Sequence, residues 1–263
     1  MKEKIIEILH NLENRYNIKI LLAVNYGSRC FGYSSTESDW DVRFIYVHRP
    51  EWYFSITKTE DVIEIMMEEY NLDIEGYELK KALSLLAKTN PNISDWLHSQ
   101  DYYILDESFL KVMQSFESHC YNTRHAMYHF YSISVKSNQH YLEKEVTLKR
   151  FIHYMRGLLS CRWIELNECH PPVNVDRLID ATITDNEDVK EKAHHLLKMK
   201  RTCKSHNMEI VDVELSNYVF NLQKYYEKIL PSYADTKTKT DFKAMSQFLM
   251  DTVMTAMNET VVS

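Results

Sequence analysis

The stretch YGSRCFGYSSTESDWDVRFIYV, residues 26–47, holds the most informative pattern of this chain: a Gly-Ser pair followed by an Asp-x-Asp pair. Ten residues separate Ser28 from Asp39. The preceding segment IKILLAV, at 18–24, is a continuous apolar run of strand length, and DVRFIYV at 41–47 is dense in β-branched and aromatic residues. This pattern predicts two strands joined by a polar loop.

Asp39 and Asp41 stand two positions apart where the second predicted strand begins. Alternate residues of a strand point to the same face, so the two carboxylates lie about 6.6 Å apart along the backbone. Neighbouring anions repel unless a cation joins them, and Mg²⁺ favours one or two carboxylates together with substrate phosphates. Arg43 shares this face and is either a phosphate ligand or the counter-ion of the two acids.

Gly27 and Ser28 close the first predicted strand. A glycine there lets backbone N–H groups approach a phosphate, and the Ser28 hydroxyl adds a donor. A helix starting at Arg29 would add a favourable dipole. Taken singly, Gly-Ser is compatible with an ordinary turn and Asp-x-Asp with a solvated strand edge. Their order, their spacing and the flanking apolar strands together favour a site for phosphate and metal.

The rest of the first hundred residues mixes helix and strand patterns. Residues 1–15 carry apolar side chains at helical spacing, whereas 62–66 and 71–74 resemble strands. Gly76 punctuates the chain before a helical pattern that begins at Leu79.

Beyond about residue 106 the strand-like alternation disappears and long segments with helical periodicity follow. We therefore expect an α+β fold: a mixed sheet flanked by helices over residues 1–106, and an all-helical part over 107–263. No flexible linker marks the boundary, so the two parts are able to share a core.

The composition excludes several classes of protein. The chain has 263 residues, of which 44% are hydrophobic and 26% charged, and no apolar run long enough to cross a bilayer. Its four glycines form neither GxGxxG nor a P-loop. A net charge of −7 argues against a broad surface for nucleic acid, although a local basic groove stays compatible. Five scattered cysteines without a CxxC pair, and an amphipathic N-terminal segment unlike a secretory leader, predict a cytoplasmic protein.

These residues resemble the DNA polymerase β-like nucleotidyltransferase superfamily, whose signature is Gly-Ser, about ten residues, and then Asp-x-Asp. The stretch described above, followed by LDIEGYELKKAL at 72–83 and NPNISDWLHS at 90–99, is similar to the RNA-repair-pathway branch of that superfamily. LKRFIHYMRGLLSCRWI at 148–164 and PPV at 171–173 extend the resemblance, which covers most of residues 20–175.

The resemblance implies a third carboxylate on a neighbouring strand, a place occupied by Asp73. In the family this acid takes the proton from the acceptor hydroxyl and shares one metal, so the implied catalytic and metal-binding set is Asp39, Asp41 and Asp73. Two ions, Mg²⁺ or Mn²⁺, would bind with the NTP and clamp an in-line displacement at the α-phosphorus. The family commonly has Glu and a small residue before Gly-Ser. Asn25 and Tyr26 stand here instead, which leaves the acceptor and nucleotide contacts open.

The triphosphate needs hydrogen-bond donors and positive charge. The candidates for nucleotide binding are Gly27, Ser28, Arg29, Arg43, Lys80, Lys81, Lys149 and Arg156. Lys149, His153 and Arg156 recur at helical spacing, so this basic stripe either lines the cleft or faces solvent.

Three functions stay open at this level. The first is transfer of an NMP from an NTP to an RNA end, and the second is the same chemistry on an antibiotic or a protein. The third is a non-catalytic or RNase-like interaction protein. The RNase-like form is considered since Arg124 and His129 resemble the Arg-x4-His motif of HEPN ribonucleases. His125 and His129 also have zinc-ligand spacing, without an accompanying HExxH glutamate or thiolate. We expect NTP and RNA as partners, and no membrane. The oligomeric state stays open.

Overall fold

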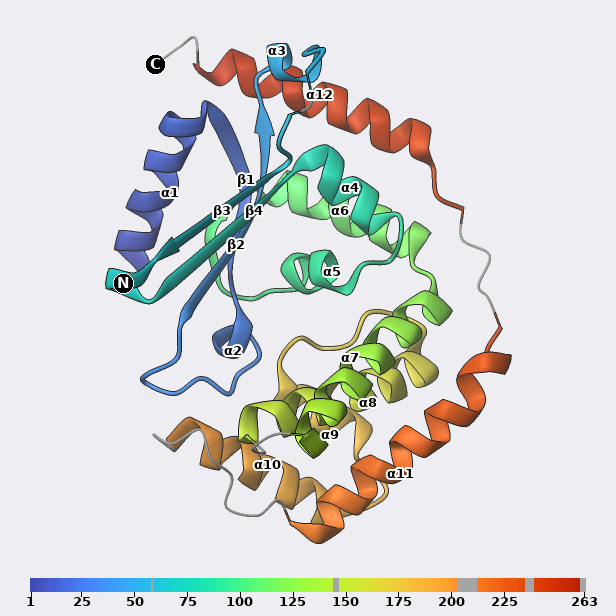
Figure 1. The fold of residues 1–263 in the computed structure, drawn as a ribbon. Coiled ribbons are helices and arrows are strands. Elements are labelled where there is room, and N and C mark those ends of the chain that lie inside the picture. Colours follow the sequence, from blue (N-terminus) through green and yellow to red (C-terminus); the bar gives the residue numbers. More distant parts are fainter. Residues whose placement is uncertain (58, 144–146, 203–211, 235–238, 261–263) are drawn as a thin grey trace.

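The computed structural model describes residues 1–57, 59–143, 147–202, 212–234 and 239–260. A sheet with its helices forms one half of the molecule, and a helical assembly forms the other half (Figure 1). The predicted α+β fold, with a mixed sheet followed by helices, is confirmed.

The sheet has five strands in the order β3-β4-β2-β1-β5. Neighbouring strands are antiparallel except β2 and β4, which run parallel. The strands are β1 (Ile18–Tyr26), β2 (Trp40–His48), β3 (Val62–Met67), β4 (Leu72–Glu78) and β5 (Tyr102–Leu105). The predicted strands at 18–24, 41–47 and 62–66 are therefore confirmed within two residues at either end.

Helices cover both faces of the sheet. α1 (Lys2–Tyr16) buries Ile5 and Leu9 against one face, together with Phe44 and Ile74 from the strands. The opposite face packs against four helices, namely α4 (Leu79–Leu86), α5 (Pro91–Leu97), α6 (Glu107–Cys120) and α12 (Phe242–Thr260). The short helix α3 (Pro50–Tyr53) follows β2, and the 3-10 turn η1 (Glu68–Tyr70) joins β3 to β4.

The helical half has its own core. It is built from α7 (Thr123–Glu143), α8 (Leu148–Asn167), α9 (Val175–Thr182), α10 (Glu187–Thr202), α11 (Val213–Ile229) and the 3-10 turn η2 (Leu230–Ser232). Phe31 and Tyr33, which follow the single-turn helix α2 (Gly27–Cys30), are buried in this core. The loop between β1 and β2 thus joins the two halves through apolar contacts.

The buried clusters do not divide at residue 106. Phe109 and Met113 of α6 pack into the core beneath the sheet, and Met245 and Val253 of α12 join them. After α11 the chain crosses back to the sheet half, where α12 lies across its upper side in Figure 1. Helices from the second part therefore complete the core of the first part. The division into residues 1–106 and 107–263 stays a prediction.

Gly76 does not end a strand as the sequence suggested. β4 continues through it to Glu78, and Gly76 pairs with Phe44 on β2 and Ile63 on β3. A Cβ at Gly76 would lie 2.1 Å from the ring Cζ of Phe44. The missing side chain makes room for this ring, so the glycine serves packing rather than chain reversal.

Substituting Gly76→Ala is expected to lower the free energy of unfolding by about 1–3 kcal/mol, because the added methyl group overpacks the core against Phe44. Urea denaturation measures this loss. The double variant G76A/F44L should recover much of it, since the smaller side chain frees the space. An unchanged urea midpoint for G76A alone would contradict this packing account.

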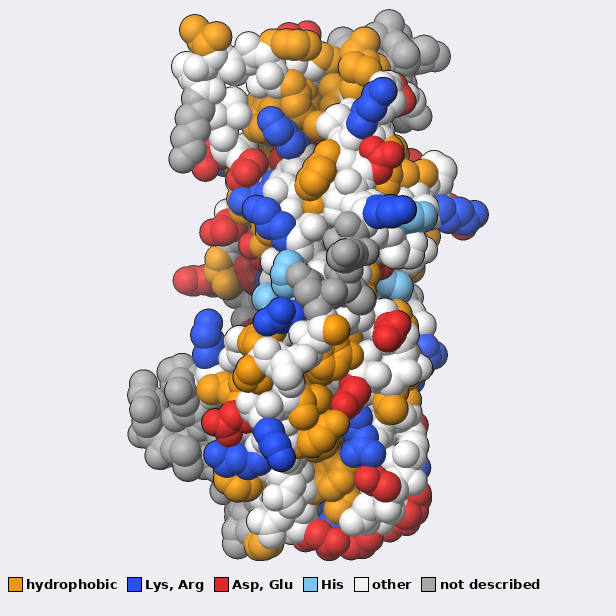
Figure 2. All heavy atoms as spheres, turned by 90° about the vertical axis from the view of Figure 1, so that its right-hand side faces the viewer, with side chains coloured by type: hydrophobic (Ala, Val, Ile, Leu, Met, Phe, Trp, Pro, Cys, Tyr) orange, Lys and Arg blue, Asp and Glu red, His pale blue; other side chains and the backbone are white. Residues whose placement is uncertain are grey.

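The surface carries charges of both signs, and the cysteines that the structure describes form no disulfides. On the face shown in Figure 2, Lys and Arg side chains are interspersed with Asp and Glu. Cys30, Cys120, Cys161 and Cys169 are free thiols, and Cys203 lies outside the described residues. In the described part of the chain, no helix combines the length and apolar character needed to span a membrane.

Candidate active site

The parallel pairing of β2 and β4 brings two of the predicted acids together. Asp41 and Asp73 are register partners, so their side chains leave the same face of the sheet. Asp39 precedes β2 and accepts a hydrogen bond from the Asn71 side chain at 2.6 Å. Burial raises the pKa of Asp41, and the negative charges of Asp73 and Asp39 raise it further. The Asp41 carboxylate therefore sits where added positive charge is favourable.

Arg43 lies among these acids. Its Nη2 is 2.7 Å from Oδ2 of Asp73 and 3.7 Å from Oδ1 of Asp41, and its Nε is 3.2 Å from Oε2 of Glu75. The Arg43 side chain is only 11% exposed. In this structure Arg43 is the counter-ion of the cluster, and a contact between Arg43 and the nucleotide stays a prediction.

The acids are not arranged as a ready-made metal site. No group of three His, Cys, Asp or Glu side chains within the described ranges has the geometry to hold a metal ion. Asp73 is engaged by Arg43 and Asp39 by Asn71, so each would have to change partner to bind a shared cation. The ligand set Asp39, Asp41 and Asp73 thus stays a prediction.

The Gly-Ser turn packs directly against the acids. Gly27 has φ 63°, and a Cβ there would lie 1.9 Å from Oδ2 of Asp41. Both the backbone conformation and the close approach require glycine. The Ser28 carbonyl accepts a hydrogen bond from the Tyr33 N–H at 3.0 Å, which closes the turn. The helix α2 starts at Gly27 rather than at Arg29 and spans a single turn.

Arg29 fixes the loop that presents Asp39. Its Nη2 donates to the Ser38 carbonyl at 2.8 Å and its Nε to the Asp39 carbonyl at 3.2 Å. The guanidinium also stacks on the Trp40 ring at 3.7 Å from the centroid. These contacts tie α2 to the start of β2. A nucleotide-binding role for Arg29 stays a prediction.

Only part of the predicted basic stripe on α8 is open to solvent. Lys149 is exposed, and its charge lowers the pKa of Asp41 against the larger effect of burial, so it lies near the acids. His153 contacts the Tyr33 hydroxyl at 3.2 Å, and burial lowers its pKa to about 4. Arg156 points into the protein interior. Lys149 is the member of the stripe best placed to meet a nucleotide.

The lysines after β4 lie away from the acids. Lys80 follows Asp73 by seven residues, roughly 23 Å along an extended chain. Its backbone N–H donates to Glu78, whereas Lys81 pairs with Asp61 at 2.9 Å. The structure does not bring Lys80 to the predicted site, because β4 runs on past Gly76 before α4 begins.

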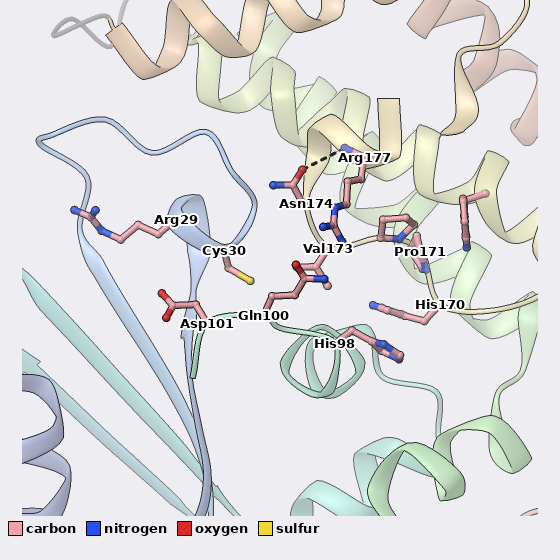
Figure 3. Close-up of a pocket in the computed structure, with 12 residues that line it drawn as sticks. Arg29, Cys30, His98, Gln100, Asp101, His170, Pro171, Val173, Asn174 and Arg177 are labelled. Carbon is pink, nitrogen blue, oxygen red and sulfur yellow. Dashed lines mark hydrogen bonds between the residues drawn. The ribbon is translucent and has the colours of Figure 1, made fainter. Parts of the chain in front are cut away.

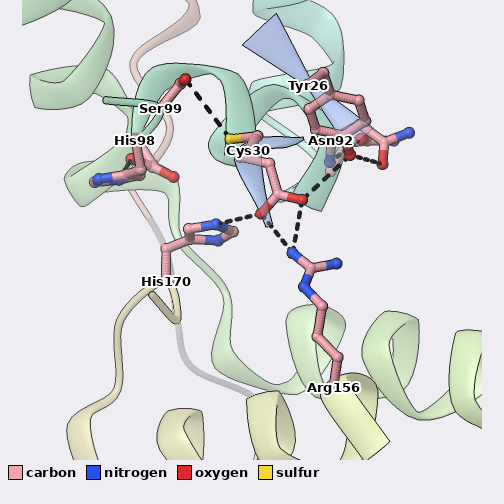
Figure 4. A network of polar contacts seen from close by, with 10 residues as sticks. Tyr26, Cys30, Asn92, His98, Ser99, Arg156 and His170 are labelled. Atoms are coloured by element: carbon pink, nitrogen blue, oxygen red, sulfur yellow. Dashed lines mark hydrogen bonds and ion pairs between the residues drawn. The ribbon is translucent and has the colours of Figure 1, made fainter. Parts of the chain in front are cut away.

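A buried polar network joins the two halves beside the acids (Figure 4). Arg156 of α8 donates to both carboxylate oxygens of Asp95 of α5, at 3.1 and 2.9 Å. His170 and the Tyr26 hydroxyl contact the same carboxylate at 3.0 and 3.2 Å. Burial alone would raise the pKa of Asp95, but Arg156 and His170 outweigh it and lower the pKa to about 2. The Arg156 charge is therefore used to hold the halves together.

Sequence reasoning missed Asp95 and His170. Both lie in or beside the segments NPNISDWLHS and PPV that carried the family resemblance. Their pairing is not visible from spacing, since 75 positions separate them.

The HEPN-like residues on α7 have ordinary packing contacts. The Arg124 guanidinium lies over the Tyr128 ring at 5.6 Å from its centroid, and the His129 ring lies beside Phe130. Burial lowers the pKa of His129. His125 and His129 belong to no metal-binding group in the described part of the chain.

The sheet with its paired acids and the family match place the chain in the class of nucleotidyltransferase-like proteins. It belongs to the RNA repair pathway DNA polymerase beta family, which matches residues 1–251. The uncharacterized protein YcgL of Bacillus subtilis (strain 168) is 32% identical over 255 residues, covering 96% of each chain. A nucleotidyltransferase-like protein from Exiguobacterium sibiricum 255-15 aligns in structure with a TM-score of 0.33 and 12% identity, over 87% of this chain and 75% of that chain. The predicted family is confirmed.

Proposed function

We propose that the protein transfers an NMP from an NTP to a hydroxyl at an RNA end and releases pyrophosphate. The observation that carries this proposal is the pairing of Asp41 with Asp73 on parallel strands, with the Gly27 backbone against Asp41. Family membership supports nucleotidyl transfer, and the family's description favours RNA as the acceptor.

Divalent cations, Mg²⁺ or Mn²⁺, fit the chemistry of this donor set. Asp39, Asp41 and Asp73 would supply the oxygen ligands that such ions prefer. The burial and like charges that raise the pKa of Asp41 favour the arrival of positive charge. When bound, the ions would neutralise the triphosphate and the leaving pyrophosphate.

The chain's own residues would position the substrates and accept the proton. The acceptor oxygen forms a bond to the α-phosphorus while the bond to the bridging oxygen breaks, and pyrophosphate leaves with that electron pair. The hydroxyl proton passes to the Asp73 carboxylate, which Arg43 must release. The Ser28 hydroxyl and the Lys149 ammonium would bind phosphate oxygens.

Incubation with α-labelled NTPs, Mg²⁺ or Mn²⁺, and separate pools of RNA, protein and aminoglycosides tests this function. We expect label in the RNA pool alone. Label in protein or aminoglycoside would keep the chemistry and change the acceptor. RNA cleavage that is lost in His129→Ala would replace the proposal with a ribonuclease.

Substituting Arg43→Gln is expected to lower the melting temperature without divalent cations, because three carboxylates lose their counter-ion. Addition of Mg²⁺ should then raise the melting temperature more than in the wild type, since the ion replaces the missing charge. Differential scanning calorimetry with EDTA or Mg²⁺ measures both effects. Arg49→Gln is the matched control, because Arg49 lies just beyond β2 and its side chain bonds only to Asn17 among the described contacts. Equal responses of R43Q and wild type to Mg²⁺ would exclude this acid cluster as the cation site.

A further inference from the structure

We propose that a cavity beside α2 binds a phosphorylated nucleotide, either the end of an RNA strand or a free monophosphate. The cavity is separate from the cluster of Asp39, Asp41 and Asp73. The inference rests on the proposed function, for which it supplies the acceptor site. The cavity has a volume of about 460 Å³, within the roughly 300–1,000 Å³ usual for small-molecule sites. Its walls come from α2, from His98, Gln100 and Asp101, from Trp163 of α8, and from residues 170–174 and Arg177 (Figure 3). None of the three acids lines it.

The charge of the cavity suits a phosphate. Arg177 lines the cavity, and its guanidinium has no carboxylate partner among the described residues. Arg29 also lines it, but in Figure 3 the Arg29 guanidinium points away from the cavity, where the carbonyls of Ser38 and Asp39 hold it. The one lining carboxylate, Asp101, is held by Lys2 at 3.1 Å and by the Asn25 side chain at 2.9 Å. The net charge of the wall is positive, and planar guanidinium groups match phosphate oxygens in geometry.

The flat groups of the cavity suit a nucleobase. Trp163, Pro171 and Pro172 form part of the wall. The imidazole rings of His98 and His170 stack on one another, with centroids 5.2 Å apart and planes at 17°, so they cover each other's faces. Proteins bind single-stranded nucleic acid by stacking bases on aromatic side chains beside positive charge. In this wall the half-buried Trp163 ring supplies the aromatic surface and Arg177 the charge.

Arg29 connects this cavity to the acids. It lines the cavity and also donates to the carbonyls of Ser38 and Asp39. The α2 turn that forms part of the cavity wall is therefore tied to the loop that presents Asp39. This leaves the face over Asp41 and Asp73 to the NTP and gives the acceptor a separate place.

Isothermal titration calorimetry of the full chain in EDTA, without NTP, tests the cavity independently of catalysis. The titrants are a short RNA that ends in a free 3′-hydroxyl, the matching nucleoside monophosphate, and inorganic phosphate. We expect Arg177→Gln to weaken nucleotide binding about tenfold, as for loss of one charge-assisted hydrogen bond. Trp163→Ala should weaken it severalfold, because the aromatic surface on which a base stacks is lost. Arg15→Gln on α1 makes the same charge change away from the cavity and should leave binding unchanged.

The outcomes separate the ligand sources. Tighter binding of RNA than of the monophosphate, with both dependent on Arg177, supports a strand end, whereas equal affinities support a free nucleotide. Binding of RNA and nucleotide that is unaffected by R177Q and W163A, or no binding at all, overturns the proposal. Inorganic phosphate that binds as tightly as the nucleotide also overturns it.

Activity distinguishes the failure of this inference from that of the proposed function. Binding that depends on Arg177 in a protein that transfers no label leaves the cavity assigned and removes the transferase. Transfer to RNA with a KM for RNA unchanged in R177Q removes the cavity as acceptor site and leaves the transferase.

Discussion

Asp41→Asn is expected to abolish nucleotidyl transfer, with a loss of at least about a thousandfold, because several kcal/mol of charge stabilisation depend on this carboxylate. The fold should persist. Burial and two neighbouring acids raise the pKa of Asp41, so the ionised side chain destabilises the folded state, and the neutral amide removes that cost. The melting temperature of D41N should equal or exceed that of the wild type. Transfer assays and calorimetry on the same preparation measure both properties.

Asp251→Asn provides the matched control. Asp251 is exposed on α12 and bonds to Gln247, so the same substitution there should change neither activity nor melting temperature. Loss of the thermal transition in D41N would show that this acid is structural. Full transfer activity in folded D41N would remove the acid pair from the mechanism.

Arg156→Met is expected to lower the free energy of unfolding by about 3–5 kcal/mol, because it leaves the Asp95 carboxylate buried without its main counter-charge. The two side chains are 8% and 2% exposed, so solvent screens their interaction little. Urea denaturation at neutral pH measures the loss. The double variant Asp95→Leu with Arg156→Met should recover much of it, because no unpaired charge then remains.

The same ion pair predicts the acid limit of the fold. The pKa of Asp95 is lowered to about 2, below its ordinary value of 3.8. Its stabilisation is therefore present above about pH 4 and is lost as the pH falls toward 2. In R156M this part of the acid transition should move to higher pH. Arg156→Lys separates the two roles of the residue. A raised KM for NTP at an unchanged melting temperature would show that Arg156 binds the nucleotide rather than joining the halves.

The local pattern around the Gly-Ser turn was predictable from the sequence because it depends on residues that are close together in the chain. The strand-forming runs on either side of it and the alternation of Asp41 and Arg43 follow from the backbone geometry of a strand. The contact of Gly27 with Asp41 and the register of Asp41 with Asp73 are long-range facts. They depend on how β1, β2 and β4 pair, which no spacing within one segment encodes.

Other features were missed because tertiary packing outweighs local preference. Gly76 was interpreted as a break between a short strand and the next helix. It lies within β4, where the Phe44 ring occupies the space that a side chain at Gly76 would need. β5 is only four residues long and gives little periodicity to detect. The spacing of Arg156 fits a basic helix face, yet its side chain is buried in an ion pair with Asp95. For Gly76 and Arg156 the deciding partner lies far away in the chain.

The return of α12 sets an order for folding during synthesis. Met245 and Val253 complete the layer beneath the sheet, although they are translated more than 130 residues after Leu105 ends the last strand. The apolar side chains of that layer therefore stay incompletely covered while the helical half emerges from the ribosome. The sheet half cannot reach its final stability first, in the order of translation, and both halves mature together once α12 is released.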